Sequence, residues 1–301
     1  MLMRIHPTIS ELATEAMIDL YIHMGLPKTG TTSIQRYLAQ FDSQLEKDGL
    51  LYPRAGRFDD GHHSLFPLGA QAERKLFANL RKELIASPAE RAVISSENAF
   101  YSNEENVRAL LTAIDIRPQL IFYARPQIEA VESAFLHRQK VGLPYNGNIR
   151  DFYKLHRRSF DYALKIEQLI FWSSAKGVVI RLYTPERAKR SAVSDFLGIF
   201  DLSLPEGYVE KRHNQSINWR YSNIISLLDS DSNVIKNRSA IINQMIMDSQ
   251  TIPQSGSGDQ SLMDADLRET IKRDYLASNQ RLLKEFVSSE DEAVFVERFI
   301  N

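Results

Sequence analysis

Residues 17–38, MIDLYIHMGLPKTGTTSIQRYL, decide the fold of this chain. Up to Gly25 the side chains alternate, and the apolar ones on one face are Ile18, Leu20, Ile22 and Met24. Such alternation predicts a β-strand. After the loop, one helical face is formed at spacing i, i+3, i+4, i+7 by Ile34, Tyr37, Leu38 and Phe41,. The stretch therefore predicts a strand–loop–helix unit.

The same two patterns recur along the chain. Further strands are predicted at 90–97 (ERAVISSE), 118–125 (PQLIFYAR) and 177–186 (GVVIRLYTPE). Helices are predicted at 8–16, 127–140, 163–175 and 187–200. Strands that alternate with helices predict an α/β fold with a parallel sheet that is covered by helices on both faces.

After about residue 200 only helical patterns remain, at 216–229, 239–249 and 265–286, with a loop at 251–261. The change of pattern predicts two parts. Residues 1–220 would form the α/β core, and residues 221–301 would form a C-terminal helical extension packed on it.

Composition narrows the function classes. The 301 residues carry 37 Lys+Arg and 38 Asp+Glu, a net charge of −1, so no overall basic field points to nucleic acid,. With no cysteine, disulfides, thiolate metal sites and cysteine nucleophiles are excluded,. No apolar run reaches the ~20 residues of a membrane span. We expect a soluble cytoplasmic protein without integral membrane association; its oligomeric state stays open.

The loop between the first strand and helix has the composition of a phosphate site. Backbone N–H groups and the positive end of the helix point at an anion there. Gly25 and Gly30 allow close approach of the backbone,. Lys28 adds a charge, and hydroxyl donors come from Thr29, Thr31, Thr32 and Ser33. The alternative is an ordinary strand–helix turn rich in small residues.

The position of the lysine argues against a nucleoside triphosphate site. GLPKTGTT has the GxxxxG spacing of a Walker A loop, but Thr31 stands where that loop has its lysine,. Lys28 instead precedes the second glycine, and no apolar run ends in a convincing Walker B aspartate. The loop is suited to phosphate without an obvious role for a triphosphate and Mg²⁺.

PKTGTT closely resembles the 5′-phosphosulfate loop of sulfotransferases that use 3′-phosphoadenosine 5′-phosphosulfate (PAPS). The pattern of bacterial sulfotransferase-like proteins also includes the glutamine of TTSIQRYL, a YP after the first helix, SSE and SNQRLL. The resemblance covers residues 18–220 and implies the three-layer P-loop-related sulfotransferase fold. It implies PAPS as donor, 3′-phosphoadenosine 5′-phosphate (PAP) as product, and no required metal.

The resemblance assigns roles within the loop. Lys28 would contact the 5′-phosphate and the oxygen that bridges to the sulfuryl group. The 5′-phosphate would be held by Pro27, Lys28, Thr29, Gly30, Thr31, Thr32 and Ser33.

A second anion site is required for the 3′-phosphate of PAPS, which the family binds with an Arg-x7-Ser pair. YARPQIEAVESAF supplies Arg125 at a predicted strand end and Ser133 on the following helix. The basic segment KRHNQS lies where family members complete this site, which suggests Lys211 and Arg212, although it lacks the family's RKG. A surface arginine with a helix serine, and a solvated charge run, are the alternatives.

Two residues compete for the role of general base. Glu97, at the end of the predicted strand in VISSE, stands where cytosolic sulfotransferases have a histidine, and several carbohydrate sulfotransferases use a glutamate. The alternative is that Glu97 serves as a cap, because SSENAF could open a helix with Ser95 or Ser96 at its N-cap,. His63 of DDGHHSLF ranks second as base; with His62 it could instead belong to a metal site, although no third ligand is spaced nearby,.

The function implied is transfer of a sulfuryl group from PAPS to a hydroxyl acceptor, with a carbohydrate as the first choice by family analogy. One alternative is a P-loop kinase or NTPase with a drifted Walker A motif. Another is a non-catalytic module that binds PAP or a glycan.

Overall fold

The computed structural model describes residues 18–26, 29–140, 147–184, 191–210, 221, 224–225, 238–251 and 262–301. Several predictions lie outside these residues. They concern the helix at 8–16, nearly all of the helix at 216–229, the loop at 252–261 and four site residues, Pro27, Lys28, Lys211 and Arg212.

A parallel sheet of five strands forms the centre of the described structure, in the order β2-β3-β1-β4-β5. The strands are β1 (Asp19–Gly25), β2 (Leu50–Leu51), β3 (Arg91–Ser95), β4 (Gln119–Ala124) and β5 (Gly177–Leu182). The predicted α/β class with a parallel sheet is confirmed. The two-residue β2 was not predicted, because it is too short for its side chains to show an alternating pattern,.

Helices surround the sheet. The first group is α1 (Thr31–Gln40), α2 (Asp42–Lys47), α3 (Arg74–Ala86), α4 (Asn98–Tyr101), α5 (Glu104–Ile114), α6 (Gln127–Lys140) and α7 (Ile149–His156). The second group is α8 (Tyr162–Ser173), α10 (Ala192–Gly198), α12 (Arg238–Thr251), α13 (Ala265–Phe286) and α14 (Glu292–Phe295). Short 3₁₀ turns are η1 (His63–Leu65) and η2 (Arg157–Phe160), and η5 (Val296–Ile300) is a π-helical turn. The helices predicted at 127–140 and 265–286 are confirmed to the residue.

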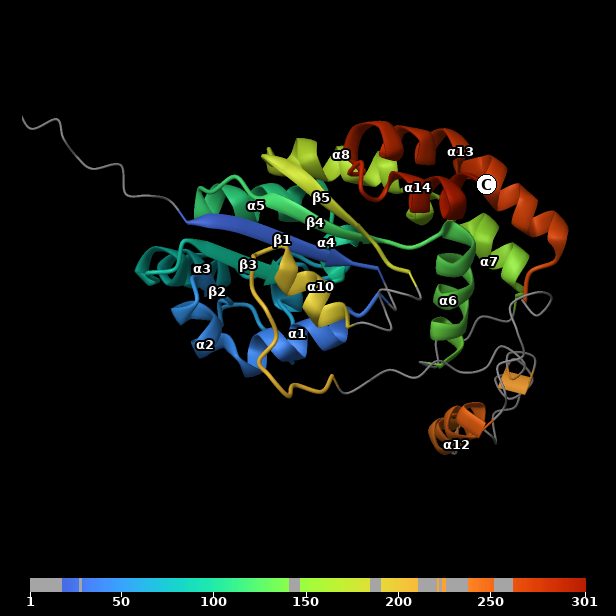
Figure 1. Ribbon diagram of the computed structural model, residues 1–301, viewed down its shortest axis with the longest axis horizontal. Coiled ribbons are helices and arrows are strands. Elements are labelled where there is room, and N and C mark those ends of the chain that lie inside the picture. The colour runs from blue at the N-terminus through green and yellow to red at the C-terminus, as the bar shows by residue number, and fades with distance from the viewer. Residues whose placement is uncertain are drawn as a thin grey trace, which may run out of the picture.

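Each face of the sheet packs on its own set of helices (Figure 1). One face of β1, with Ile22 and Met24, belongs to a large cluster shared with α3, α5, α8 and α13. The other face packs on α1, α2 and α10, where Tyr21 meets Phe200 and His23 meets Phe196. The predicted alternation is confirmed, and the face that carries Tyr21 and His23 is also covered. Because side chains pack on both faces of β1, the strand is held in place, and so is the start of the loop that follows it.

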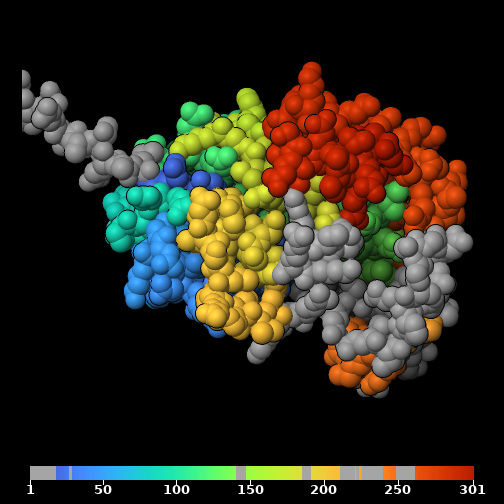
Figure 2. Space-filling model, in the orientation of Figure 1, coloured from blue at the N-terminus to red at the C-terminus, as the bar shows by residue number. Residues whose placement is uncertain are grey.

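The described part of the C-terminal region packs on the core. α13 contacts α8, α6 and β5, and Figure 2 shows the red C-terminal helices against the yellow-green α8 region. Hydrogen bonds reinforce the contact: Tyr153 donates to Asp274 at 2.7 Å, and Ser278 donates to Asp161 at 2.7 Å. α13 also contributes apolar side chains to the large cluster, Leu267, Ile271, Tyr275 and Leu282. The boundary at residue 220 stays a prediction.

Among the helices that the structure describes, none combines the length and the apolar composition needed to cross a lipid bilayer.

Candidate functional site

The predicted site residues follow three neighbouring strands at one edge of the sheet. Glu97 comes two residues after β3, the loop at 26–30 follows β1, and Arg125 comes directly after β4. β1 lies between β3 and β4. The next two strands in the chain, β2 and β3, lie on one side of β1, and the last two, β4 and β5, lie on the other side. Parallel sheets bind ligands at the carboxyl edge where the strand order changes direction in this way.

Close packing shapes the loop after β1. A Cβ atom on Gly25 would lie 1.8 Å from the hydroxyl oxygen of Thr31, so only glycine lets Thr31 take this place. Gly30 has φ of 85°, in the left-handed region, and a Cβ there would lie 2.5 Å from the Cβ of Ala192,. Both glycines of the predicted phosphate loop are thus required by the backbone and its neighbours.

Thr29 closes the turn of this loop. It is fully buried, and its hydroxyl and backbone N–H both donate to the carbonyl of Leu26, at 2.8 and 3.2 Å. The hydroxyl that was predicted to hold phosphate therefore stabilises the loop in this conformation. The start of α1, at Thr31, Thr32 and Ser33, provides the N–H groups that lack acceptors within the helix,. No acidic residue lies in this first turn, which suits an anion,.

We expect Gly25→Ala to destabilise the protein, because the added methyl group has to displace the Thr31 hydroxyl from a buried position. Overpacking of this kind costs about 1–3 kcal/mol. Thermal or urea unfolding measures the loss. Gly177→Ala is the matched control, since its Cβ would lie 3.7 Å from the Gln119 side chain, an ordinary contact. Equal stability of the two variants would contradict the packing argument.

Ser95 and Ser96, at the end of β3, bind histidines. The Ser95 hydroxyl is hydrogen-bonded to Nδ1 of His23 at 2.8 Å, and the Ser96 hydroxyl to Nδ1 of His63 at 3.1 Å. The N-cap position of α4 is occupied by Glu97, which makes no side-chain cap hydrogen bond. The helix start of the alternative is confirmed, with Glu97 at the cap position, and only the assignment of the N-cap to Ser95 or Ser96 is wrong. The two serines instead connect three elements at the carboxyl edge.

Gln35 joins this group from α1. Its amide nitrogen donates to the Ser95 hydroxyl at 3.2 Å. A Cβ on Gly61 would lie 2.6 Å from Nε2 of His63 and 2.8 Å from the amide nitrogen of Gln35, so both side chains crowd over the Gly61 backbone. The glutamine-bearing helix noted in the sequence thus contacts the segment that carries His63. Its contact with β3 lies beyond what local sequence patterns reveal.

The two candidate bases differ in their surroundings. Burial lowers the pKa of His63, and the nearby charge of Asp59 opposes this shift, so the ring is mainly neutral at pH 7. Glu97 is half-buried at the start of α4. Burial, together with the Glu97 charge, raises the pKa of Tyr101 to about 12. The mainly neutral ring of His63 can accept a proton at pH 7.

His62 has a different role from His63. It is fully buried, its Nε2 donates to the carbonyl of Pro53 at 2.8 Å, and its Nδ1 accepts the backbone N–H of Ser95 at 3.2 Å. Both ring nitrogens are therefore engaged in structural hydrogen bonds. Among the described residues no group of three or more histidine, aspartate or glutamate side chains is arranged to hold a metal ion.

Acid is expected to destabilise the fold through His23 and His62. Burial lowers the pKa of each from 6.5 to about 3, so in this window the unfolded chain binds protons that the folded chain does not. Stability therefore falls as pH drops from 6.5 towards 3, by about 1.4 kcal/mol per pH unit for each histidine,. Urea unfolding across this window measures the slope. His62→Gln should make it shallower, and an unchanged slope would contradict the assignment.

Arg125, the predicted 3′-phosphate residue, is already part of an ion pair. Its Nε lies 3.1 Å from Oε2 of Glu129, and its backbone carbonyl accepts the Tyr162 hydroxyl at 3.0 Å. Ser133 is half-buried on α6, one turn beyond Glu129 and on the same face,. Glu129 also pairs with Arg298. Neither Glu129 nor Arg298 was predicted, because no short motif joins residues so far apart.

Comparisons with known proteins add a likeness of fold. No family model matches the chain, and no curated protein matches its sequence. The crystal structure of a sulfotransferase from Alicyclobacillus acidocaldarius is similar at 15% identity and a TM-score of 0.48, over 89% of this chain and 94% of that chain. A likeness at this level carries no argument about the site, so the residues above stand on their own geometry.

Proposed function

We propose that the chain transfers a sulfuryl group from PAPS to a hydroxyl acceptor. The observation that carries this proposal is the order of the strands: β1 lies between β3 and β4, so a phosphate loop, a carboxylate and an arginine follow three adjacent strands at one edge. PAPS has phosphates on two sides of its ribose, and it requires two separate anion sites with a base near the sulfur.

The loop supports the first anion site. Gly25 and Gly30 are constrained by their neighbours, and the N-terminus of α1 carries no acidic side chain. Lys28, between the two glycines in sequence, would stabilise the charge that develops on the leaving 5′-phosphate. Pro27 would complete the loop. The backbone N–H groups of Thr31, Thr32 and Ser33 would hold the phosphate oxygens.

The chemical step needs in-line attack. The acceptor oxygen forms a bond to sulfur while the bond from sulfur to the 5′-phosphate oxygen breaks, and PAP leaves with that electron pair. The proton of the acceptor hydroxyl passes to Glu97, or in second rank to His63. Catalysis of such a loose transfer rests on positioning and charge stabilisation.

The 3′-phosphate would bind at Arg125 and Ser133. The guanidinium of Arg125 offers paired N–H donors for phosphate oxygens. In the described contacts, Glu129 binds the Nε of this guanidinium. Lys211 and Arg212 stay proposed as further cations from the following segment. A carbohydrate remains the proposed acceptor class, on family analogy alone.

Ligand-induced stabilisation tests the proposal and separates it from its alternatives. PAP should raise the unfolding temperature, while Mg²⁺–ATP should not, because a ligand stabilises only the protein that binds it. Radiolabelled PAPS with a panel of sugars then tests transfer. Stabilisation by Mg²⁺–ATP alone would favour a kinase or NTPase. Binding of PAP without transfer to any acceptor class would favour a non-catalytic module.

A further inference from the structure

We propose that Arg298 is a phosphate-binding residue that completes the 3′-phosphate subsite with Arg125 and compensates the charge of Glu129. This inference rests on the proposed function and assigns a residue to that site from the far end of the chain. Arg298 belongs to the π-helical turn η5, 173 residues after Arg125 in the sequence.

One carboxylate joins the two arginines. Oε2 of Glu129 lies 3.1 Å from Nε of Arg125, and Oε1 of Glu129 is hydrogen-bonded to Nη2 of Arg298. The two oxygens of one carboxylate each bind a different guanidinium, so Glu129 bridges the two cations. Both arginine side chains are largely buried, with 20% and 19% exposure.

The charge of this cluster is the central argument. Arg125 paired with Glu129 alone has no net charge, and its pull on a phosphate dianion is weak. Glu129 stands on the same helical face as Ser133, so its carboxylate would face the same ligand,. Arg298 restores a net charge of +1 for the three groups. An anion site at Arg125 therefore needs Arg298.

Arg298 also has hydrogen-bonding capacity that the described contacts do not use. Its Nη1 is buried and has no hydrogen-bond partner within the described residues. A buried N–H of a charged group without an acceptor is costly, so such groups are nearly always paired. Phosphate oxygens are the acceptors that a guanidinium binds best.

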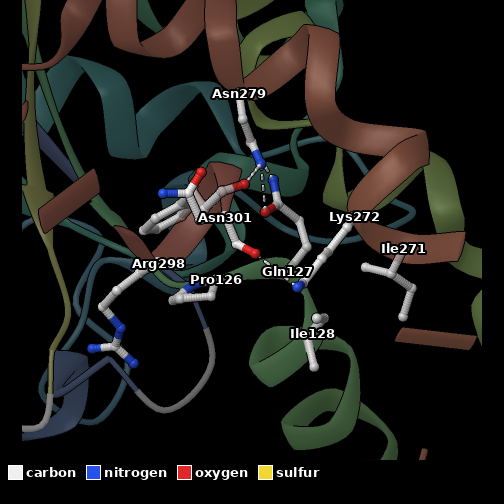
Figure 3. Close-up of a pocket in the computed structure, with 9 residues that line it drawn as sticks. Pro126, Gln127, Ile128, Ile271, Lys272, Asn279, Arg298 and Asn301 are labelled. Atoms are coloured by element: carbon white, nitrogen blue, oxygen red, sulfur yellow. Dashed lines mark hydrogen bonds between the residues drawn. The ribbon is translucent and has the colours of Figure 1, made fainter. Parts of the chain in front are cut away.

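A buried amide pair fixes the turn that carries Arg298. Gln127 donates to Asn279 at 2.7 Å, and Asn279 donates to Gln127 at 3.1 Å and to the carbonyl of Phe299 at 2.9 Å. The pair thus ties the residue after Arg298 to the start of α6, two residues before Glu129. Figure 3 shows the Arg298 side chain extending away from this amide pair.

The inference concerns the guanidinium end of Arg298, where it meets Glu129 beside Arg125. A pocket beside the amide pair is bordered by Lys272, which donates to the backbone oxygen of Asn301 at 2.8 Å.

The test compares two nucleotides that differ at the 3′ position, PAP and adenosine 5′-monophosphate, by calorimetric titration. Wild-type protein should bind PAP more tightly. Arg298→Gln should weaken PAP about 10-fold or more, the value of one charge-assisted hydrogen bond, and leave adenosine 5′-monophosphate unchanged. An unchanged PAP affinity, or an equal loss for both nucleotides, would overturn the proposal.

Charge rescue separates a phosphate-binding role from a purely structural one. The variant Glu129→Gln/Arg298→Gln returns the cluster to a net charge of +1, so it should recover most of the PAP affinity that Arg298→Gln loses. Removing both partners of an ion pair can also repair a structural defect, but such a repair would act on PAP and adenosine 5′-monophosphate alike. Recovery confined to PAP therefore marks the phosphate-binding role. Failure of the double variant to recover affinity would count against the charge argument.

Two controls keep the result decisive. Arg298→Lys keeps the positive charge and should keep the preference for PAP. This variant provides the readout if Arg298→Gln folds poorly. Arg281→Gln removes an arginine of α13 that lies 3.6 Å from Glu167, and should change neither affinity. If wild-type protein binds neither nucleotide, the proposed function itself fails. If it prefers PAP and Arg298→Gln does too, only the role of Arg298 fails.

Discussion

Lys28→Ala is expected to lower the rate of PAPS-dependent transfer by about 100- to 1000-fold, the effect of removing one group that stabilises transition-state charge. The lysine precedes Gly30 in a loop whose glycines have no room for a side chain. A cation there would meet the oxygen that gains charge as the bond to sulfur breaks. Single-turnover kinetics with labelled PAPS measure the loss.

The control for Lys28→Ala is Lys176→Ala. Lys176 lies at the opposite edge of the sheet, where its Nζ is 2.6 Å from Asp19 at the start of β1, and its loss should leave transfer unchanged. Unfolding temperatures of both variants show that they are folded. Full transfer activity in Lys28→Ala would contradict the proposed role and the reading of the loop.

Glu97→Gln is expected to lower kcat by about 100- to 10,000-fold, the contribution of a positioned general base. Glutamine keeps the size of the side chain and cannot accept the proton. PAP affinity should be unchanged, because Glu97 would contact the acceptor rather than the nucleotide. The readout is kcat at saturating PAPS together with PAP binding by titration.

His63→Gln distinguishes the two candidate bases. His63 is hydrogen-bonded to Ser96, so its loss should cost less than about 10-fold if it only positions the end of β3,. Glu104→Gln is the carboxylate control, since Glu104 forms an exposed pair with Arg108 at 2.7 Å. If His63→Gln lowers kcat more than Glu97→Gln does, and also removes the acid limb of the pH profile of kcat, the general base is His63 instead of Glu97.

Local patterns predicted much of the fold. The alternation of β1 and the helical spacing of α1 involve side chains only a few residues apart, so both were correct from the sequence. α6 and α13 were also predicted to the residue. The strands β3 and β5 were predicted too long. β3 ends at Ser95, because Ser96 binds His63 and Glu97 takes the N-cap position of α4. β5 ends at Leu182.

The places of several candidate residues in the fold followed from the sequence, while their roles stay predictions. The sequence located the loop after β1, Glu97 after β3 and Arg125 after β4, because each comes directly after a recognisable strand. It assigned the Thr29 hydroxyl to phosphate, whereas in the structure this hydroxyl donates to Leu26. A buried hydroxyl binds the nearest carbonyl when one is in reach, and sequence spacing does not show that.

By itself the sequence determined the parallel α/β class and the strand–loop–helix unit, because these depend on side chains close together in the chain. The tertiary structure decided which distant groups meet. It brought His23 to Ser95 across 72 residues and Glu129 to Arg298 across 169. Such pairs form only when strand order and helix packing bring separate elements together, and no local spacing encodes them.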